Sequence, residues 1–136
     1  MDMLVDFAGG KRVDVHFGPF TVHTDQPREG GGDDSAPGPF DLFLASLAAC
    51  AGYYVLGFCQ KRGLPTDGLQ LVQRSEVNPV TGHVEQLQVE IQLPVDFPEK
   101  YRDAVIRAAE QCKVKKHLDH PPVFCVTIRP VEAMTP

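Results

Sequence analysis

The sequence has little positive charge. It carries 13 lysine and arginine residues against 18 aspartate and glutamate residues, which gives a formal net charge of −5. The basic residues are scattered, and the densest group (Lys113, Lys115 and Lys116) covers only a few positions. Because binding to phosphates needs clustered basic side chains, the sequence argues against nucleic acid as the main partner.

The pattern of a signal peptide is also missing from the N-terminus. Met1–Phe7 contains two aspartates and no basic region, and no apolar run precedes Gly9. We therefore expect a cytoplasmic location, where thiols are kept reduced. The four cysteines are then predicted to be free thiols, metal ligands or redox-active groups rather than a disulfide framework.

One apolar run is long enough to cross a membrane. Leu42–Cys59 is 18 residues without a charge, which meets the minimum length for a spanning helix. The run is diluted with alanine, glycine and serine, stands alone in mid-chain, and has amphipathic segments on both sides. These features favour a buried helix in a soluble protein and no membrane partner.

Motifs for common cofactors are absent. Gly30-Gly31-Gly32 is not followed by the lysine and serine or threonine of a P-loop, and it does not open a helix directly. The sequence has no dinucleotide fingerprint and no G-x-S-x-G nucleophile elbow. We expect no cofactor.

Hydrophobic periodicity predicts a single α+β domain over residues 1–136. Short strands are expected within residues 2–25, and a glycine-rich loop over residues 26–38. The later elements are a helix over about 39–62, a hairpin of Leu69–Val77 and Val84–Leu93, a second helix opened by Pro98, a final strand at Val123–Arg129, and a frayed tail from Pro130.

The long helix has apolar residues on almost every face, so it must be surrounded by protein. Its small residues are spaced by four, with Ala45 before Ala49 and Ala48 before Gly52, and this spacing allows another backbone to approach closely. The rest of the chain offers little to enclose such a helix. We therefore expect it to pack against its own copy in a homodimer.

Two of the cysteines are candidates for redox chemistry. Cys50 lies in the middle of the apolar helix, where a free cysteine is often only a small core residue. A reactive Cys50 would need a nearby cation, and the candidates are Lys11, Arg12 and Arg28. Cys112 ends the apolar stripe of the second helix, so it faces the same interior and could form a disulfide with Cys50.

The other two cysteines are predicted to be structural. Cys59 falls on the opposite helix face from Cys50, and Cys125 alternates with core residues of the last predicted strand. A zinc site at Cys112, His117 and His120 is an alternative, but its spacing matches no common zinc pattern, so no metal is expected.

Two stretches resemble the OsmC/Ohr family. GPFDLFLASLAAC at residues 38–50 has proline, an acidic residue, an alanine-rich apolar run and a cysteine, and AAEQCKV at residues 108–114 looks like the family's later cysteine motif. The resemblance covers nearly the whole chain in element order. Proline followed by an apolar residue and an acid is closest to the YhfA-like branch.

The resemblance implies an intertwined homodimer with antiparallel sheets around a long buried central helix and active sites at the dimer interface. It also implies a peroxiredoxin-like thiol peroxidase in which Cys50 attacks an organic hydroperoxide and Cys112 resolves the sulfenic acid as a disulfide. A dithiol, with a lipoyl-type dithiol as one candidate, would then reduce the enzyme. The alternative is a non-enzymatic protein that binds an apolar ligand or senses redox state.

The resemblance also implies roles for other side chains. Arg12, which follows Gly9-Gly10-Lys11, would be the activating arginine, with Arg28 as a second candidate and Asp41 as the carboxylate that orients the guanidinium. An apolar substrate pocket would be formed by Phe40, Phe43, Leu47 and Tyr54.

Overall fold

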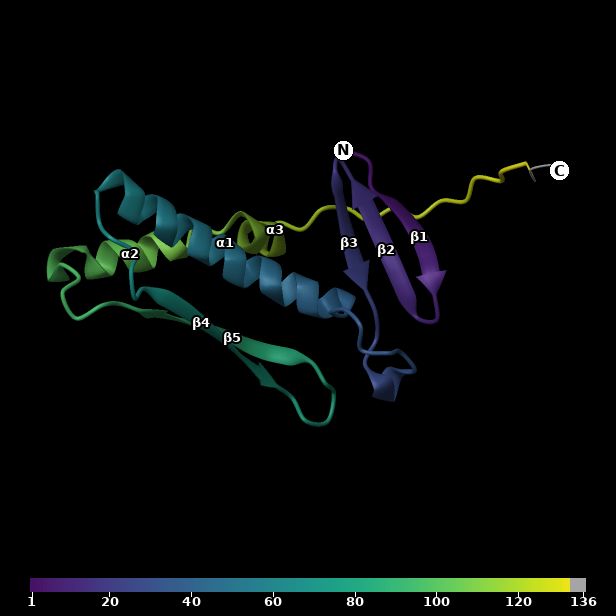
Figure 1. Cartoon of the computed structure of the whole chain (residues 1–136), viewed down its shortest axis with the longest axis horizontal. Coiled ribbons are helices and arrows are strands. Elements are labelled where there is room, and N and C mark those ends of the chain that lie inside the picture. The colour runs from purple at the N-terminus through teal and green to yellow at the C-terminus, as the bar shows by residue number, and fades with distance from the viewer. Residues whose placement is uncertain (133–136) are drawn as a thin grey trace.

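The N-terminal residues form a three-stranded antiparallel sheet, as their alternation predicts (Figure 1). The computed structural model describes residues 1–132. Gly9, at the end of the first strand, and Gly10, in the turn that follows, have φ values of 104° and 60°, which glycine adopts without strain. The strands are β1 (Leu4–Gly9), β2 (Arg12–Phe17) and β3 (Phe20–Thr24).

This sheet has one apolar and one polar face. Because neighbouring residues in a strand point to opposite faces, the register places Val5, Val15 and Val22 in one row on the apolar face. Phe7 and Phe20 are on the same face and are 85% and 62% exposed. The apolar face of β1–β3 is therefore largely uncovered within one chain.

Asp25 organises the loop that follows β3. Its carboxylate accepts hydrogen bonds from the Gln26 N–H at 2.7 Å, the Ser35 N–H at 3.0 Å and the Ser35 hydroxyl at 2.6 Å. A Cβ at Gly32 would lie 2.1 Å from the Gln26 carbonyl oxygen, so this position requires glycine. The glycine run therefore shapes a structural loop around Asp25, which includes the short 3₁₀ turn η1 (Arg28–Gly30).

The predicted long helix is α1 (Pro39–Lys61). Pro39 occupies its first turn, where the missing N–H costs no hydrogen bond, and the Asp41 carboxylate accepts from the Gly38 N–H at 3.0 Å. Gly63 follows the helix with φ of 63°, as is common after a helix C-terminus. The prediction of this helix is confirmed.

Only one stripe of α1 is buried. The stripe contains Leu47, Ala51, Val55, Phe58 and Cys59, whereas large side chains on other faces remain exposed. Among the described residues, α1 is the one helix whose length and hydropathy would suit a membrane span. The buried stripe instead makes α1 the central helix of the fold.

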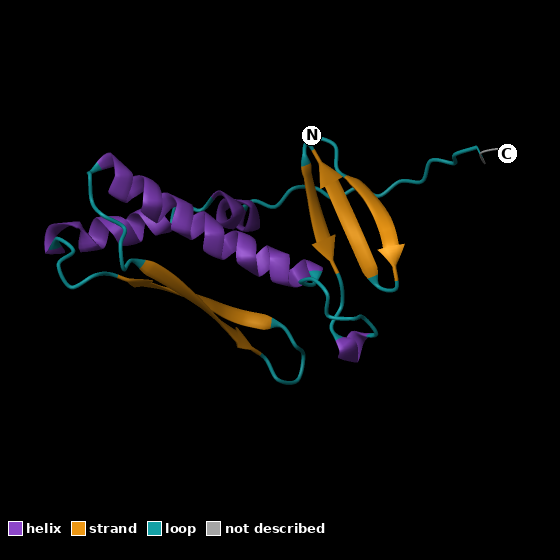
Figure 2. Ribbon diagram, in the orientation of Figure 1, coloured by secondary structure: helices purple, strands orange, loops and turns teal. Residues whose placement is uncertain are grey.

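The second half of the chain packs on this stripe. The predicted hairpin is confirmed as β4 (Gln70–Val77) paired with β5 (Val84–Gln92). The helical turns are η2 (Glu99–Tyr101), α2 (Arg102–Ala109) and α3 (Lys113–Asp119). Figure 2 shows the hairpin along one side of α1 and α2 next to the C-terminal half of α1. The core consists of Val55, Phe58, Cys59, Phe97 and Val105.

Two predictions about the C-terminal part are wrong. Cys112 is not on the second helix, because α2 ends at Ala109 and Cys112 begins α3. Val123–Arg129 is not a strand, and Cys125 is exposed rather than buried. A strand needs a neighbour to accept its backbone hydrogen bonds, and this segment runs away from the helices (Figure 1). Of the predicted tail, residues 133–136 lie outside the described part.

Candidate functional site

The fold brings Cys50 and Cys112 together, as the sequence predicts. Cys50 comes from the middle of α1 and Cys112 from the junction between α2 and α3, and the two thiols are close enough for each to shift the pKa of the other. Both are free cysteines; Cys112 is buried and Cys50 is partly exposed. Two elements distant in sequence therefore place a pair of thiols at one point.

The surroundings of Cys50 favour its thiolate. Burial raises the pKa of Cys50, but hydrogen bonds from the Val114 backbone, the Cys112 side chain and the Lys113 backbone oppose this effect, as does the charge of Lys113. Together they lower the pKa of Cys50 below its ordinary value. A thiolate is the nucleophilic form of cysteine, so Cys50 is the better nucleophile of the pair.

The pKa of Cys112 is shifted in the opposite direction. Burial raises its pKa, and the neighbouring Cys50 raises it further through hydrogen bonding and charge. The sulfur of Cys112 also caps α3, since it accepts a hydrogen bond from the Lys115 N–H at 3.4 Å. The raised pKa thus keeps Cys112 in the thiol form beside Cys50.

Lys113 supplies the positive charge beside Cys50, and the sequence analysis did not single it out for this role. It directly follows Cys112 and is the first residue of α3. Because Cys112 lies beside Cys50, Lys113 lies near Cys50 as well. Its position next to the second cysteine is a signal that could have identified it.

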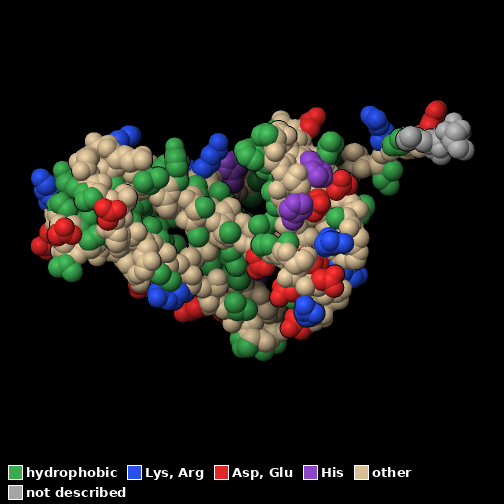
Figure 3. Space-filling view, viewed as in Figure 1, with side chains coloured by type: hydrophobic (Ala, Val, Ile, Leu, Met, Phe, Trp, Pro, Cys, Tyr) green, Lys and Arg blue, Asp and Glu red, His purple; other side chains and the backbone are tan. Residues whose placement is uncertain are grey.

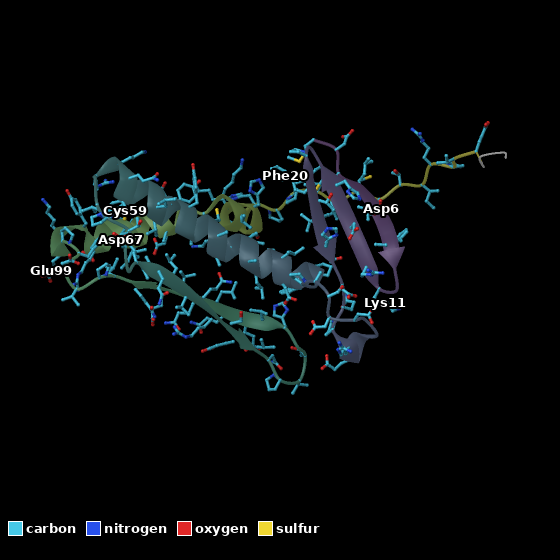
Figure 4. All side chains as sticks on the ribbon, viewed as in Figure 1. Asp6, Lys11, Phe20, Cys59, Asp67 and Glu99 are labelled. Atoms are coloured by element: carbon cyan, nitrogen blue, oxygen red, sulfur yellow. The ribbon has the colours of Figure 1, made fainter. Side chains whose placement is uncertain are left out.

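The basic residues that the sequence analysis did propose are in the N-terminal part. Arg12 donates from Nε to the Gly9 carbonyl at 3.3 Å. Lys11 is at the β1–β2 turn (Figure 4), and Arg28 belongs to η1. Asp41 caps α1 through Gly38. Within one chain Arg12 and Asp41 therefore serve local structure, and the roles predicted for all four residues at Cys50 stay predictions.

An apolar groove reaches Cys112, the buried cysteine of the pair. It has a volume of about 650 Å³ and lies between α1, the β4–β5 hairpin, α2 and α3. Cys112 lines it together with aliphatic side chains from α1, β5 and α2, namely Leu47, Leu87, Val89, Ile91, Val105 and Ile106. A cavity of this size suits a small organic ligand.

Gln73 adds one polar atom to this groove. Its amide nitrogen donates to the Leu44 carbonyl at 3.0 Å, which fixes the side chain against α1. Its Oε1 is buried and has no hydrogen-bond partner within residues 1–132. A buried acceptor without a partner is costly unless a ligand or water satisfies it, so Oε1 is suited to a donor group in the groove.

The residues predicted to form the substrate pocket are divided among three hollows. Leu47 lines the groove that contains Cys112. Phe40 and Phe43 line a second hollow beside the β4–β5 loop, and Tyr54 lines a third near the C-terminal end of α1. Of these four residues, Leu47 alone shares a cavity with Cys112 in the part of the chain that the structure describes.

Cys59 is fully buried in the core, and burial raises its pKa, which confirms its structural role (Figure 4). Within residues 1–132, the alternative zinc ligands Cys112, His117 and His120 do not form a group able to hold a metal ion. His117 instead bonds through Nδ1 to the Lys113 carbonyl at 2.8 Å.

Comparison with solved structures shows the same fold in several bacterial proteins. A Psychrobacter arcticus protein named for osmotic stress induction and detoxification response is 20% identical, with a TM-score of 0.71 over 84% of this chain and 85% of that one. The organic hydroperoxide resistance protein OsmC of Legionella pneumophila is 19% identical, with a TM-score of 0.51 over 87% and 89%.

A Vibrio cholerae protein named for organic hydroperoxide resistance, with captopril bound in one of its active sites, is 17% identical. Its TM-score is 0.56, over 89% of this chain and 86% of that one. No curated protein sequence matches the chain. The family model for OsmC-like proteins matches residues 31–127, which contain both cysteines of the site. The chain therefore belongs to the OsmC-like protein family.

Proposed function

We propose that this protein is a thiol-dependent peroxidase that reduces organic hydroperoxides, with Cys50 as the peroxidatic and Cys112 as the resolving cysteine. The observation that carries the proposal is a pair of adjoining thiols, one of them lining an apolar groove, whose pKa values are shifted in opposite directions. Membership of the OsmC-like family and structural neighbours named for organic hydroperoxide resistance support a role in redox or peroxide stress.

In the first step the Cys50 thiolate attacks the distal oxygen of the hydroperoxide. The O–O bond breaks, the sulfur is oxidised by two electrons to a sulfenic acid, and the alkoxide takes a proton from solvent to leave as an alcohol. The lowered pKa of Cys50 increases the fraction of nucleophile available for this step at neutral pH.

In the second step the Cys112 sulfur attacks the sulfenic acid. A disulfide forms and water leaves with the hydroxyl of the sulfenic acid and the proton of the Cys112 thiol. An external dithiol, with a lipoyl-type dithiol as the candidate, then reduces the disulfide and becomes a disulfide itself. This cycle requires a reducing compartment, so a cytoplasmic location is part of the proposal.

The groove supports an organic rather than an inorganic peroxide. Its aliphatic lining would bury an alkyl chain, and burial of apolar surface is favourable at about 25 cal/mol per Å². Hydrogen peroxide has no apolar group and would gain nothing from this lining. The Gln73 Oε1 would accept a hydrogen bond from a hydroxyl of the ligand.

We further propose that the active protein is a homodimer. The uncovered apolar side chains support this, since α1 exposes Phe40 and Tyr53, β1 exposes Phe7, and the segment after α3 exposes Phe124 and Ile128. A second copy could cover α1 and the apolar face of β1–β3 and pair with the segment that the sequence predicts to be a strand. In such a dimer Arg12 of the second copy becomes a candidate for the predicted role at Cys50.

The proposal is tested with the reduced protein, cumene hydroperoxide and a dithiol. We expect Cys50→Ser to abolish turnover and Cys112→Ser to react once, forming a sulfenic acid that a dimedone probe traps. Cys59→Ser removes a buried thiol outside the pair and is the matched control, with turnover retained. Peroxide consumption by Cys50→Ser at the wild-type rate would disprove the assignment.

A second experiment tests Lys113. Lys113→Met removes the charge beside Cys50, so the pKa of Cys50 rises and its alkylation rate at neutral pH falls. Lys116→Met, three residues further along α3, is the control and leaves the alkylation rate unchanged. If both variants alkylate at the wild-type rate, another group activates Cys50.

The groove also favours a second candidate function, in which the protein binds an apolar ligand without turnover and the thiols act as a redox switch. The same assays separate the two functions. A rapid single oxidation with no dithiol-dependent turnover, together with an apolar ligand that copurifies with the protein, would favour the second.

A further inference from the structure

The polar face of the N-terminal sheet gathers groups that ligate metals. The register aligns Asp6 of β1, Asp14 of β2 and His23 of β3 in one row, and His16 follows two residues after Asp14 on the same face. Figure 3 shows histidine and acidic side chains together over this sheet. None of these four residues takes part in the proposed peroxidase site.

Three of these side chains converge on one point. A carboxylate oxygen of Asp6, a carboxylate oxygen of Asp14 and a ring nitrogen of His16 all lie within 4.8 Å of one another. In this position Asp14 is only 15% exposed, whereas Asp6 is 66% exposed and His16 39% exposed. The group is thus open to solvent on one side and supported by the sheet on the other.

A cation would stabilise the two carboxylates. Asp6 and Asp14 are directly opposite each other on paired antiparallel strands, an arrangement that is unfavourable for like charges. Within residues 1–132, neither aspartate forms a salt bridge with lysine or arginine. Their charged partners are the rings of His16 at 3.1 Å and His23 at 3.0 Å, which are positive only when protonated.

The ring of His16 is held in the orientation that a ligand needs. Its Nδ1 is 3.0 Å from the Thr21 hydroxyl, and its Nε2 points to the Asp6 carboxylate. If Nδ1 donates its proton to Thr21, Nε2 presents a lone pair toward the two aspartates. A second hydrogen bond of this kind fixes the tautomer of metal-binding histidines.

We propose that Asp6, Asp14 and His16 form a binding site for a divalent transition-metal ion of the zinc type. The two carboxylates and the imidazole supply three ligands, water completes the coordination, and His23 supports Asp14 from behind. An imidazole and carboxylates together suit zinc, nickel or copper better than magnesium or calcium, which prefer oxygen ligands alone.

The ordinary interpretation of this cluster is a set of surface His–Asp pairs, which contribute little to stability. A metal site differs from such pairs because a bound ion measurably stabilises the folded protein. An ion bound by Asp6 and by two residues of β2 links the edge strand to the centre of the sheet and stabilises the folded protein by mass action. Because the apolar face is opposite, this site stays accessible when a second copy covers that face.

The test measures binding of zinc to the full-length reduced protein after treatment with a chelator and its removal. We expect one equivalent to bind and to raise the midpoint of thermal unfolding. Asp6→Asn and His16→Asn should each weaken binding more than about tenfold, and Thr21→Val, which removes only the orienting hydroxyl, by roughly tenfold. His83→Asn, at an exposed histidine of the β4–β5 loop, is the matched control and leaves binding unchanged.

Thiols also bind zinc, so the test must separate the two sites. Binding that survives in Cys50→Ser and Cys112→Ser, and a cobalt-substituted spectrum without a thiolate charge-transfer band, support the Asp–His site. Binding that disappears in those variants, or persists unchanged in Asp6→Asn and His16→Asn, overturns it, as does a failure of the wild type to bind. Circular dichroism of each variant confirms that the sheet is intact.

Discussion

The β1–β3 sheet and the α1–hairpin layer each have an apolar face, but only one of them is buried within the chain. The hairpin and α2 cover one stripe of α1 and enclose Val55 and Val105, which are 1% and 0% exposed. The apolar face of the sheet leaves Phe7 at 85% exposed. One half of the molecule therefore encloses its apolar side chains within the chain, whereas the other leaves them uncovered.

The largest expected effect is in the buried half. Phe58 packs in the core and lies under the Arg62 guanidinium, which is 3.7 Å from the ring centroid. Phe58→Ala should lower the free energy of unfolding by about 3–5 kcal/mol, because it leaves a cavity and loses buried area. Urea denaturation measures this, with Tyr53→Ala, at an exposed position of the same helix, as the comparison. Equal losses in both variants would contradict the unequal packing of the two faces of α1.

A smaller effect is expected in the uncovered half. Phe7→Ser should leave the fold of the single chain intact, because the ring has few contacts within the chain, but should weaken the proposed dimer by at least about tenfold. Sedimentation velocity over a range of concentrations measures this. Thr21→Ser on the polar face is the control. A dimer of unchanged affinity in Phe7→Ser would place the interface elsewhere.

The smallest effect concerns the loop between the halves. Hydrogen bonds from the Ser35 side chain and backbone, and from Gln26, lower the pKa of Asp25 from 3.8 to about 2. A carboxyl with a lowered folded-state pKa stabilises the protein above its unfolded pKa, and this contribution is lost as pH falls from about 4 toward 2. Asp25→Asn should flatten the stability profile in that range, as measured by urea denaturation at several pH values.

Asp34→Asn is the matched control for Asp25→Asn, because Asp34 is in the same loop and its φ of 53° is one that asparagine tolerates. It removes a charge without removing the Asp25 hydrogen bonds. If the two variants show the same pH profile, the loop does not depend on the Asp25 carboxylate.

Local patterns were sufficient to predict most of the elements. The alternation in the first 25 residues and the proline at the start of α1 predict strands and a helix that the structure contains. The convergence of Cys50 and Cys112 follows from two apolar segments that must share one core. Each of these features depends on contacts within the chain, and such contacts leave a periodic signal in the sequence.

The end of a helix inside an apolar stripe, and a segment without a pairing strand, could not be predicted in this way. The apolar stripe of the second helix continues to Cys112 in the sequence, but the helix ends at Ala109. Cys112 was therefore predicted to lie within the second helix, whereas it caps the next one. The alternation in Val123–Arg129 predicts a strand, yet no strand in the described residues pairs with it. The pattern in the sequence records a preference for pairing and does not identify the partner.

The capping role of Cys112 has a consequence for the proposed cycle. The sulfur that accepts the Lys115 N–H at the start of α3 is the same sulfur that would form the disulfide. Formation of the disulfide would compete with this hydrogen bond. Each catalytic cycle would then weaken and restore the N-terminal cap of α3. Since this helix leads directly into the exposed C-terminal segment, the oxidation state of one atom could be transmitted as a change in backbone order.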